Sequence, residues 1–191
     1  EQLKKKKKQL TELLKPFCQV RDVIGMEDPW HYRNKVHAVI ARDRKRRIIS
    51  GVYKEGTHFV LPVDTCLIED QKADDIIRTI RELVPSFKMK VYDEDTGYGF
   101  LRHVLIRTGH STGEIMVVLV TAQPVLPGAK NFVKALLTEA EKQSVTITTI
   151  VQNVNDRKTS VVLGDMEKVL YGKGFILDEL CGKTYALSPR S

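Results

Sequence analysis

The chain has 191 residues, of which 42% are hydrophobic, and it carries a formal net charge of +7. This length accommodates one large domain or a domain with an appended element, and the hydrophobic content excludes a globally disordered chain. No apolar run approaches the roughly 20 residues of a membrane helix, and the charged N-terminal region lacks a secretory hydrophobic segment. Three widely spaced cysteines, Cys18, Cys66 and Cys181, do not form a disulfide framework and favour a cytoplasmic, reducing location.

The positive charge is concentrated in the first quarter of the chain. Residues 1–47 contain fourteen Lys and Arg against six Asp and Glu, a balance of +8, while the other 144 residues sum to −1. Such segregation is typical of a localised basic surface that binds nucleic acid. A solvated helix face together with a basic hairpin accounts for the same charge, so charge alone leaves both interpretations open.

An N-terminal helix is predicted from apolar residues at near-helical spacing, and Pro16 marks its expected end. These apolar residues are Leu3, Leu10, Leu13, Leu14 and Phe17. The lysines at positions 4–8 surround more than one helical turn, so no single face is apolar there. We therefore expect this helix to be exposed or to lie against an acidic partner.

An antiparallel meander of three strands is predicted next. The strands are expected at residues 30–37, 48–53 and 57–63, and the turn at 42–47 is very basic. In the first strand, alternation places Arg33, Lys35 and His37 on one side. Arg33 and Lys35 are candidates for an RNA-binding surface.

A central hairpin is predicted from strands at residues 101–107 and 114–121. The second of these strands is almost continuously apolar, which is typical of a strand that is covered on both faces. The first strand carries Arg102, His103 and Arg107, which a central strand does not normally bury without partners. These side chains either reach water or acidic groups beyond the sheet edge, or they meet an anionic ligand.

Amphipathic helices are predicted at about residues 70–84, before Pro85, and around residues 132–140. Further strands are expected at residues 145–151, 160–163, 175–177 and 184–187. The predicted fold class is therefore α+β: a mostly antiparallel sheet with amphipathic helices on one side, preceded by an N-terminal basic helix.

Motifs for catalysis are missing. No Gly-rich loop joins a strand to a helix, no two cysteines have metal-knuckle spacing, and the five histidines form no helical i, i+4 pair. Buried hydrophobic packing is the commoner role of a lone cysteine. We therefore assign no catalytic residue and do not expect the chain to be a complete enzyme.

Several short motifs nevertheless occur in a characteristic order. They are Tyr32-Arg33-Asn34-Lys35, Gly51-Val52-Tyr53, Gly56-Thr57-His58, the lone Cys66, Leu101-Arg102-His103, Ile106-Arg107, Asn153-Val154-Asn155, Leu163-Gly164, Leu170-Tyr171-Gly172 and Leu187-Ser188-Pro189-Arg190-Ser191. In order and spacing they resemble the central region of the RNA uracil-5-methyltransferases, which modify ribosomal or transfer RNA. The resemblance covers nearly the whole chain.

The resemblance implies a division of labour among domains. In this family an N-terminal TRAM-type barrel binds RNA, a central α+β domain shapes the RNA-binding cleft, and a C-terminal domain binds S-adenosylmethionine and carries the nucleophilic cysteine. The expected organisation is an N-terminal basic helix at 1–20, the central domain at 21–187 and the start of a link to the methyltransferase domain at 188–191. The catalytic groups and the cofactor site then lie beyond Ser191, and the fragment alone is predicted to be inactive.

The resemblance also gives Cys66 an expected role. In members with a [4Fe–4S] cluster, a cysteine at this position is one ligand, and the other three come from a segment upstream of the first helix. Four thiolates are the usual requirement. Cys66 is therefore predicted as a single iron–sulfur ligand of an incomplete site, with a cluster expected in the full-length protein only.

The sequence as a whole predicts a substrate-positioning fragment of an S-adenosylmethionine-dependent RNA uracil-5-methyltransferase, with 23S ribosomal RNA favoured over transfer RNA. The predicted RNA-binding residues are Arg33, Lys35, Arg102, His103 and Arg107, with Arg33 and Arg102 first. The alternative is a stand-alone RNA-binding or ribosome-associated module without catalytic activity. A protein-interaction adaptor is disfavoured by the charge segregation.

Overall fold

A computed structural model describes residues 1–159 and 161–191, which form two compact units, Glu1–Trp30 and His31–Ser191. The first unit contains helix α1 (Gln2–Leu14), none of whose residues is buried, as expected from its ring of lysines. The helix ends just before Pro16, and Lys7 Nζ forms an ion pair of 2.5 Å with the Asp22 carboxylate. No helix among the described residues is long and apolar enough to cross a membrane.

The second unit is built on a seven-stranded sheet with the strand order β3-β2-β1-β4-β5-β6-β7. The strands are β1 (Lys35–Arg42), β2 (Ile48–Tyr53), β3 (Val60–Pro62), β4 (Leu101–Thr108), β5 (Ile115–Thr121), β6 (Thr149–Val154) and β7 (Met166–Tyr171). Only β5 and β6 pair in parallel, and every other neighbouring pair is antiparallel. Strands β8 (Ile176–Leu180) and β9 (Lys183–Leu187) form a separate hairpin.

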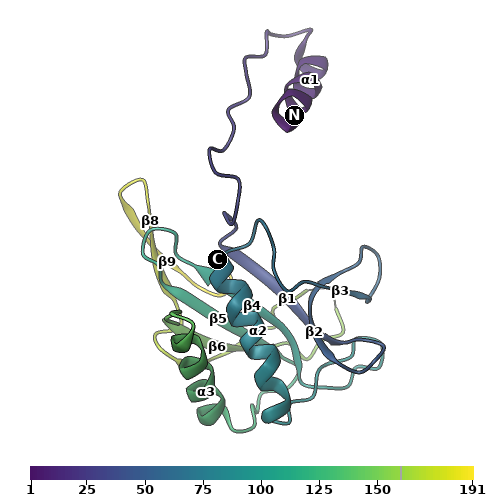
Figure 1. Ribbon diagram of the computed structural model, residues 1–191, viewed down its shortest axis with the longest axis vertical. Coiled ribbons are helices and arrows are strands. Elements are labelled where there is room, and N and C mark those ends of the chain that lie inside the picture. Colours follow the sequence, from purple (N-terminus) through teal and green to yellow (C-terminus); the bar gives the residue numbers. More distant parts are fainter. Residues whose placement is uncertain (160) are drawn as a thin grey trace. The chain divides into compact units, whose positions relative to one another are not determined.

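Helices α2 (Gln71–Ser86) and α3 (Ala129–Lys142) cover one face of the sheet (Figure 1). Ile76, Ile80 and Val84 of α2 are spaced by three or four residues, so they share one helix face, and all three are buried. They pack in one cluster with Phe132 and Leu136 of α3 and with aliphatic residues of the central strands. The α+β class with a mostly antiparallel sheet and helices on one side is thus confirmed.

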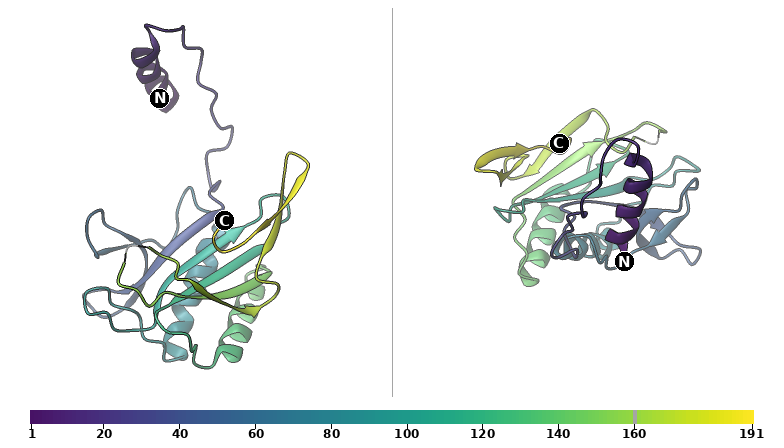
Figure 2. Two further views of the ribbon diagram at one scale, coloured as in Figure 1. Left: turned by 180° about the vertical axis from the view of Figure 1, so that it is seen from behind. Right: turned by 90° about the horizontal axis from the view of Figure 1, so that it is seen from above.

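The opposite face of the sheet, which we call the outer face, is covered only in part. Leu105, Met116, Val118 and Val151 form a second cluster there with Ile176 of β8. Figure 2 shows the β8–β9 hairpin on the side of the sheet away from α2 and α3. All residues of β5 are therefore buried, as its continuous apolar run predicts. The outer face over β1 and β2 has no such cover.

The first predicted strand, at residues 30–37, is wrong in position, because β1 spans Lys35–Arg42. Residues 31–34 bond to a different segment: His31 N–H donates to the Leu67 carbonyl, and Arg33 N–H donates to the Ile68 carbonyl. The apolar residues Val36, Ala38 and Ile40 alternate towards the helices and place the strand in the core. Arg33 therefore lies before the strand and not within it.

Other predicted strands also differ from the structure. The strand expected at 57–63 is reduced to β3, because residues 54–57 form a turn closed by a bond from Thr57 N–H to the Lys54 carbonyl. The strand expected at 145–151 is β6, which begins at Thr149. Residues 161–163 form no strand, and Ser160 lies outside the described residues. Strand β7 was not predicted, because it is an edge strand whose residues are mostly exposed and lack apolar alternation.

Candidate RNA-binding face

The structure brings two of the predicted cations together at one end of the outer face. Lys35 of β1 and Arg107 of β4 are direct cross-strand partners. Lys35 Nζ donates to the carbonyl oxygen of Ser191 at 2.8 Å, and an Arg107 guanidinium N–H donates to the same oxygen. Neither cation is paired with an Asp or Glu side chain among the described residues. The two positive charges thus lie side by side at the Ser191 oxygen, and we regard them as candidates to attract an anion.

Arg33 lies two residues before β1, and its side chain is half exposed. Its guanidinium is 3.9 Å from the Glu69 carboxylate, a long contact that leaves donors available. Burial raises the pKa of Glu69, with a further increase from Asp74, and the charge of Arg33 opposes this rise. We therefore regard Arg33 as a loosely held cation that is accessible to solvent.

Arg102 is different, because its side chain is only 1% exposed. Nη2 donates to both Glu94 oxygens at 2.9 and 3.0 Å, Nε donates to Glu94 Oε1 at 3.2 Å, and Nη1 donates to the carbonyls of Asn155 and Arg157, both at 2.8 Å. The guanidinium also lies 4.4 Å from the centre of the Tyr92 ring. All five donors are used within the chain, so in this structure none remains for a phosphate, and direct RNA contact by Arg102 stays an untested prediction.

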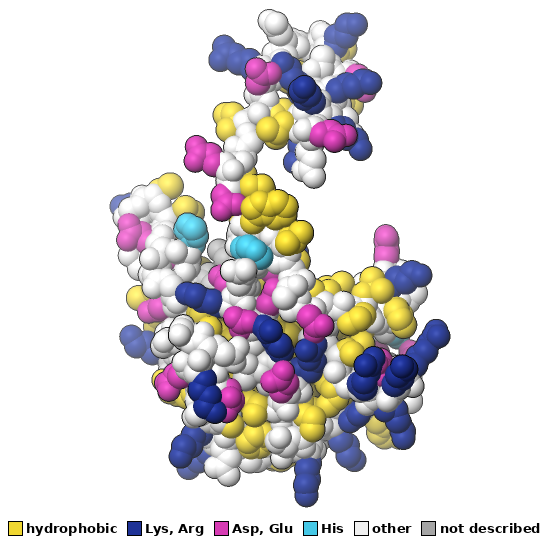
Figure 3. Space-filling view, in the orientation of Figure 1, with side chains coloured by type: hydrophobic (Ala, Val, Ile, Leu, Met, Phe, Trp, Pro, Cys, Tyr) yellow, Lys and Arg dark blue, Asp and Glu magenta, His cyan; other side chains and the backbone are white. Residues whose placement is uncertain are grey.

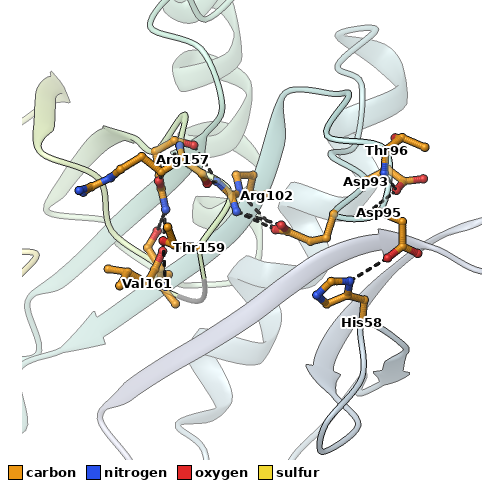
Figure 4. A network of polar contacts seen from close by, with 11 residues as sticks. His58, Asp93, Asp95, Thr96, Arg102, Arg157, Thr159 and Val161 are labelled. Atoms are coloured by element: carbon orange, nitrogen blue, oxygen red, sulfur yellow. Dashed lines mark hydrogen bonds and ion pairs between the residues drawn. The ribbon is translucent and has the colours of Figure 1, made fainter.

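Figure 4 shows Arg102 between the loop that carries Arg157 and Thr159 and the loop that carries Asp93 and Asp95. Asn155 extends this network, because its Nδ2 donates to the carbonyls of Val161 and Val162 at 2.7 and 2.9 Å. The buried arginine therefore joins two loops that are more than fifty residues apart in sequence. Its role in this structure is to hold those loops in place.

His103 is also buried, with 4% of its surface exposed. Its ring packs edge-on against His37 of β1, with ring centres 4.8 Å apart. Burial, the His37 ring and the Arg102 charge lower the pKa of His103 to about 3, and burial also lowers the pKa of His37. Both rings are thus neutral at pH 7. The outer face therefore combines neutral aromatic nitrogens with the free cations of its far end.

Cys66 lines a cavity of about 230 Å³ together with Arg33, Glu69 and Asp74. The Cys66 N–H donates to the Asp74 carboxylate at 2.8 Å. Cys18 lies in the first unit and Cys181 in the β8–β9 turn, and both are exposed. Within the described ranges, no three His, Cys, Asp or Glu side chains are grouped as a metal site requires. The residues present therefore do not fit an iron–sulfur cluster, and Cys66 stands alone as a predicted ligand.

The strongest exposed charge is on the turn between β1 and β2. Arg42, Arg44, Lys45, Arg46 and Arg47 are all exposed there. Figure 3 shows a dense group of Lys and Arg side chains at this end of the molecule. The single acid of the turn, Asp43, is used internally, because it accepts the backbone N–H groups of Lys45 and Arg47. The turn is therefore an ordered projection with a high density of positive charge.

Sequence reasoning missed Tyr53, Glu94 and the partnership of His37 with His103. Tyr53 lies on the outer face with its ring 6.4 Å from that of His103, and burial and Glu94 raise its pKa to about 12. Tyr53 and His103 each lie in a motif that carries the family resemblance, so the motifs were the available signal. Sequence order alone does not show that β1, β2 and β4 bring them side by side.

Comparisons with known proteins give one consistent result, although no protein-family model matches the chain. An uncharacterized RNA methyltransferase of Halalkalibacterium halodurans is 38% identical over 195 residues, which cover 100% of the chain and 42% of that protein. One from Listeria monocytogenes is 36% identical over 194 residues, again 100% of the chain and 42% of that protein. One from Clostridium tetani is 38% identical over 173 residues, or 91% of the chain and 36% of that protein.

A solved structure is similar along the same length. The tRNA (uracil-54, C5)-methyltransferase of Pyrococcus abyssi, in complex with S-adenosyl-L-homocysteine, aligns with a TM-score of 0.78 and 26% identity. The alignment covers 100% of the chain and 43% of that protein. The resemblance to RNA methyltransferases is thus confirmed, and the chain spans about two fifths of the length of the relatives it matches.

Proposed function

We propose that the chain is the RNA-positioning part of a longer, cytoplasmic RNA uracil-5-methyltransferase that uses S-adenosylmethionine. The observation that carries this proposal is the similarity to RNA methyltransferases along the whole chain, joined to the fold shared with a tRNA uracil-5-methyltransferase. In this proposal the chain supplies a basic surface. The cofactor and the nucleophile are assigned to the remaining part of the longer protein.

The mechanism we propose for this part is positioning. Arg33, Lys35 and Arg107 neutralise phosphates of the bound RNA, and the turn at residues 42–47 adds longer-range attraction. Methylation at C5 requires access to the face of the uracil ring, so the target base has to leave the stack. A rigid sheet that holds the flanking nucleotides keeps the RNA in the open conformation while a neighbouring domain acts on the base.

The sequence motifs favour 23S ribosomal RNA as the substrate, and the similar solved structure favours transfer RNA as the second candidate. The two are distinguished by measuring methyl transfer to each transcript with the longer protein that carries this chain. We expect incorporation at uridine C5 in one fragment of 23S ribosomal RNA and none in transfer RNA. Methylation of transfer RNA alone reverses the order of the candidates, and methylation of neither contradicts the proposal.

The division of labour is tested on the 191-residue chain itself. Calorimetric titration with S-adenosylmethionine is expected to give no heat above dilution, whereas titration with substrate RNA is expected to give a saturable isotherm. A saturable isotherm with S-adenosylmethionine in the micromolar range moves the cofactor site into these residues and contradicts the assignment. If neither ligand gives heat above dilution, the result favours a role for the chain that does not involve contact with RNA.

A further inference from the structure

A groove of about 730 Å³ opens on the outer face beside the His37–His103 pair. Its lining comes from β1, β2 and β4, from the turn after β2 and from the loop after β6. The lining residues are His37, Tyr53, Lys54, Glu55, Gly56, Thr57, His58, Glu94, His103, Lys158, Thr159 and Val162. Its size lies within the range of about 300–1,000 Å³ that is usual for sites that bind small organic groups.

The inner part of the groove is aromatic and uncharged. The rings of Tyr53 and His103 are almost perpendicular, at 85°, and His58 lies 6.0 Å from Tyr53 on the outer side. Within the described residues, His37 Nε2 and His103 Nδ1 are buried and have no hydrogen-bond partner. Unsatisfied buried nitrogens are uncommon in folded proteins and often mark a site where a ligand or water completes the bonding. Neutral aromatic groups suit a flat, uncharged ring better than a phosphate.

The rim of the groove has the opposite character. Lys54 and Lys158 are exposed, and each carries an amino group that can reach an anion at the mouth. Of the two acids in the lining, Glu94 is neutralised by Arg102 and Glu55 remains. Asp95, next to the lining, is bonded to His58 at 2.8 Å and raises the pKa of that imidazole, so its charge is partly offset there. A neutral aromatic interior with lysines at its edge matches the chemistry of a single nucleotide, whose base is apolar on its faces and whose phosphates are anionic.

Arg102 determines the shape of this groove without entering its lining. It binds Glu94 on one side and the carbonyls of Asn155 and Arg157 on the other, and it thereby joins the two loops that supply Glu94 and Lys158 to the lining. The space above Gly97 is filled by the Lys158 side chain, since a Cβ there would lie 2.5 Å from Lys158 Cε. The two walls are thus fixed relative to each other before any ligand arrives, which lowers the cost of ordering them on binding.

We propose that this groove binds one unstacked nucleobase of single-stranded RNA, with the base against Tyr53 and the two imidazoles and its flanking phosphates on Lys54 and Lys158. The proposal rests on the proposed function and deepens it, because it assigns a place to a nucleotide other than the one that is methylated. In this proposal Arg102 is a positioning residue, because it holds the loops that line the groove. Holding a neighbouring base out of the stack keeps the RNA loop open.

The test uses the 191-residue chain and short single-stranded RNA of equal length and charge in two forms. One form carries the fluorescent base 2-aminopurine at its centre, and the other carries an abasic nucleotide there. Stacking on an aromatic side chain is worth about 1–3 kcal/mol per base, which corresponds to about fivefold or more in affinity. We expect the intact RNA to bind more tightly by at least this factor, with quenching of 2-aminopurine fluorescence.

Matched variants locate the effect. Tyr53→Leu is expected to bring the ratio of the two affinities close to one, whereas Tyr185→Leu, which removes a half-exposed tyrosine on β9, is expected to leave it unchanged. Lys158→Ala is expected to weaken both RNAs equally, since it removes a phosphate contact, and Lys130→Ala on α3 to weaken neither. Circular dichroism checks that each variant is folded.

The outcomes separate this proposal from the proposed function. Equal affinity for the intact and abasic RNAs, with binding that weakens steeply in salt, overturns the groove proposal and leaves the RNA-positioning function standing. No binding of either RNA overturns both. If Tyr53→Leu does not fold, the imidazole nitrogen resonances of His37 and His103 in the unmodified chain decide: we expect them to shift with intact RNA and to stay constant with abasic RNA, and the absence of a shift overturns the proposal.

Discussion

The two faces of the sheet differ in the residues that cover them. The helix face is covered by α2 and α3 and is packed with aliphatic residues and phenylalanines, so non-directional burial of apolar area stabilises it. On the outer face, the half over β1 and β2 carries His37, His103 and Tyr53 and lies next to the buried Arg102–Glu94 pair. We propose that the outer face carries the RNA-binding groove, while the helix face contributes to stability alone. The predictions that follow measure how much individual residues of the outer side contribute to the free energy of unfolding and to RNA affinity.

The largest effect is expected from Arg102 on the outer side. Arg102→Met removes the ion-pair partner that Glu94 has in the described part of the chain, together with three bonds to carboxylate oxygens. Breaking a buried ion pair on one side typically costs about 3–5 kcal/mol, because the remaining charge stays buried. We expect a loss of that size in the free energy of unfolding, measured by urea denaturation.

Two matched variants sharpen this prediction. Combining Arg102→Met with Glu94→Gln is expected to recover part of the loss, since no uncompensated charge remains. Arg107→Met, five residues along the same strand, is expected to cost about 1 kcal/mol, the usual worth of a single hydrogen bond. Equal losses for the Arg102 and Arg107 variants contradict the division between a structural and a free arginine.

The free energy of unfolding is expected to depend on pH because of the His103 ring. Its folded pKa of about 3 lies below its unfolded pKa, so the unfolded chain binds the proton more strongly. The stability that depends on the neutral ring is complete above about pH 6.5 and is lost as the pH falls towards 3, with a slope of up to about 1.4 kcal/mol per pH unit. His37 contributes in the same direction, because burial also lowers its pKa.

The measurement compares the unmodified chain with His103→Gln between pH 4 and 8. Subtracting the two curves removes the titration of carboxylates, including Glu69 and Asp74, whose raised pKa values act in the opposite direction. We expect the difference between the two chains to shrink as the pH falls. A difference that is independent of pH shows that the His103 ring is not shielded from protons, and the neutral interior of the groove is then disproved.

The smallest effect is expected at Cys66. We expect the chain to purify without iron or labile sulfide, because a single thiolate does not hold a cluster. Cys66→Ser is expected to change the free energy of unfolding by about 1 kcal/mol, since the side chain is only partly buried and the bond to Asp74 comes from the backbone. Near-stoichiometric iron after anaerobic reconstitution brings Cys18 and Cys181 into a common site and contradicts this account.

The difference between the two faces also explains which features of the fold and the site were predictable from the sequence. Ile76, Ile80 and Val84 lie at helical spacing, so the helix face was predictable from local periodicity. The burial of Arg102 was not, because its partners, Glu94 and the carbonyls of Asn155 and Arg157, come together only when β4 and β6 share a sheet. Strand β7 gave no alternating apolar pattern, since an exposed edge strand does not require one.

Two of the motifs that carry the resemblance contact each other in the structure, and local sequence patterns did not predict this contact. Asn153 Nδ2 donates to the Gly164 carbonyl at 3.0 Å, and Gly164 N–H donates to Asn153 Oδ1 at 2.7 Å. A Cβ at Gly164 would lie 1.7 Å from the Val154 carbonyl oxygen, so only glycine fits there. Two motifs that carry the family resemblance therefore form one structural unit, and Arg33, Lys35 and Arg107 remain the residues assigned to RNA.

The central claim is that these three cations bind RNA phosphates, and the salt dependence of affinity tests it most directly. In the triple variant Arg33→Ala, Lys35→Ala and Arg107→Ala, the slope of log affinity against log salt is expected to fall by about 2, or about 0.7 for each phosphate contact with single-stranded RNA. The control variant removes three lysines of α1, at positions 4–6, and carries the same net charge. Its slope is expected to stay close to that of the unmodified chain. Equal slopes for the two triple variants would show that the attraction depends on net charge alone and would contradict the assignment of phosphate binding to Arg33, Lys35 and Arg107.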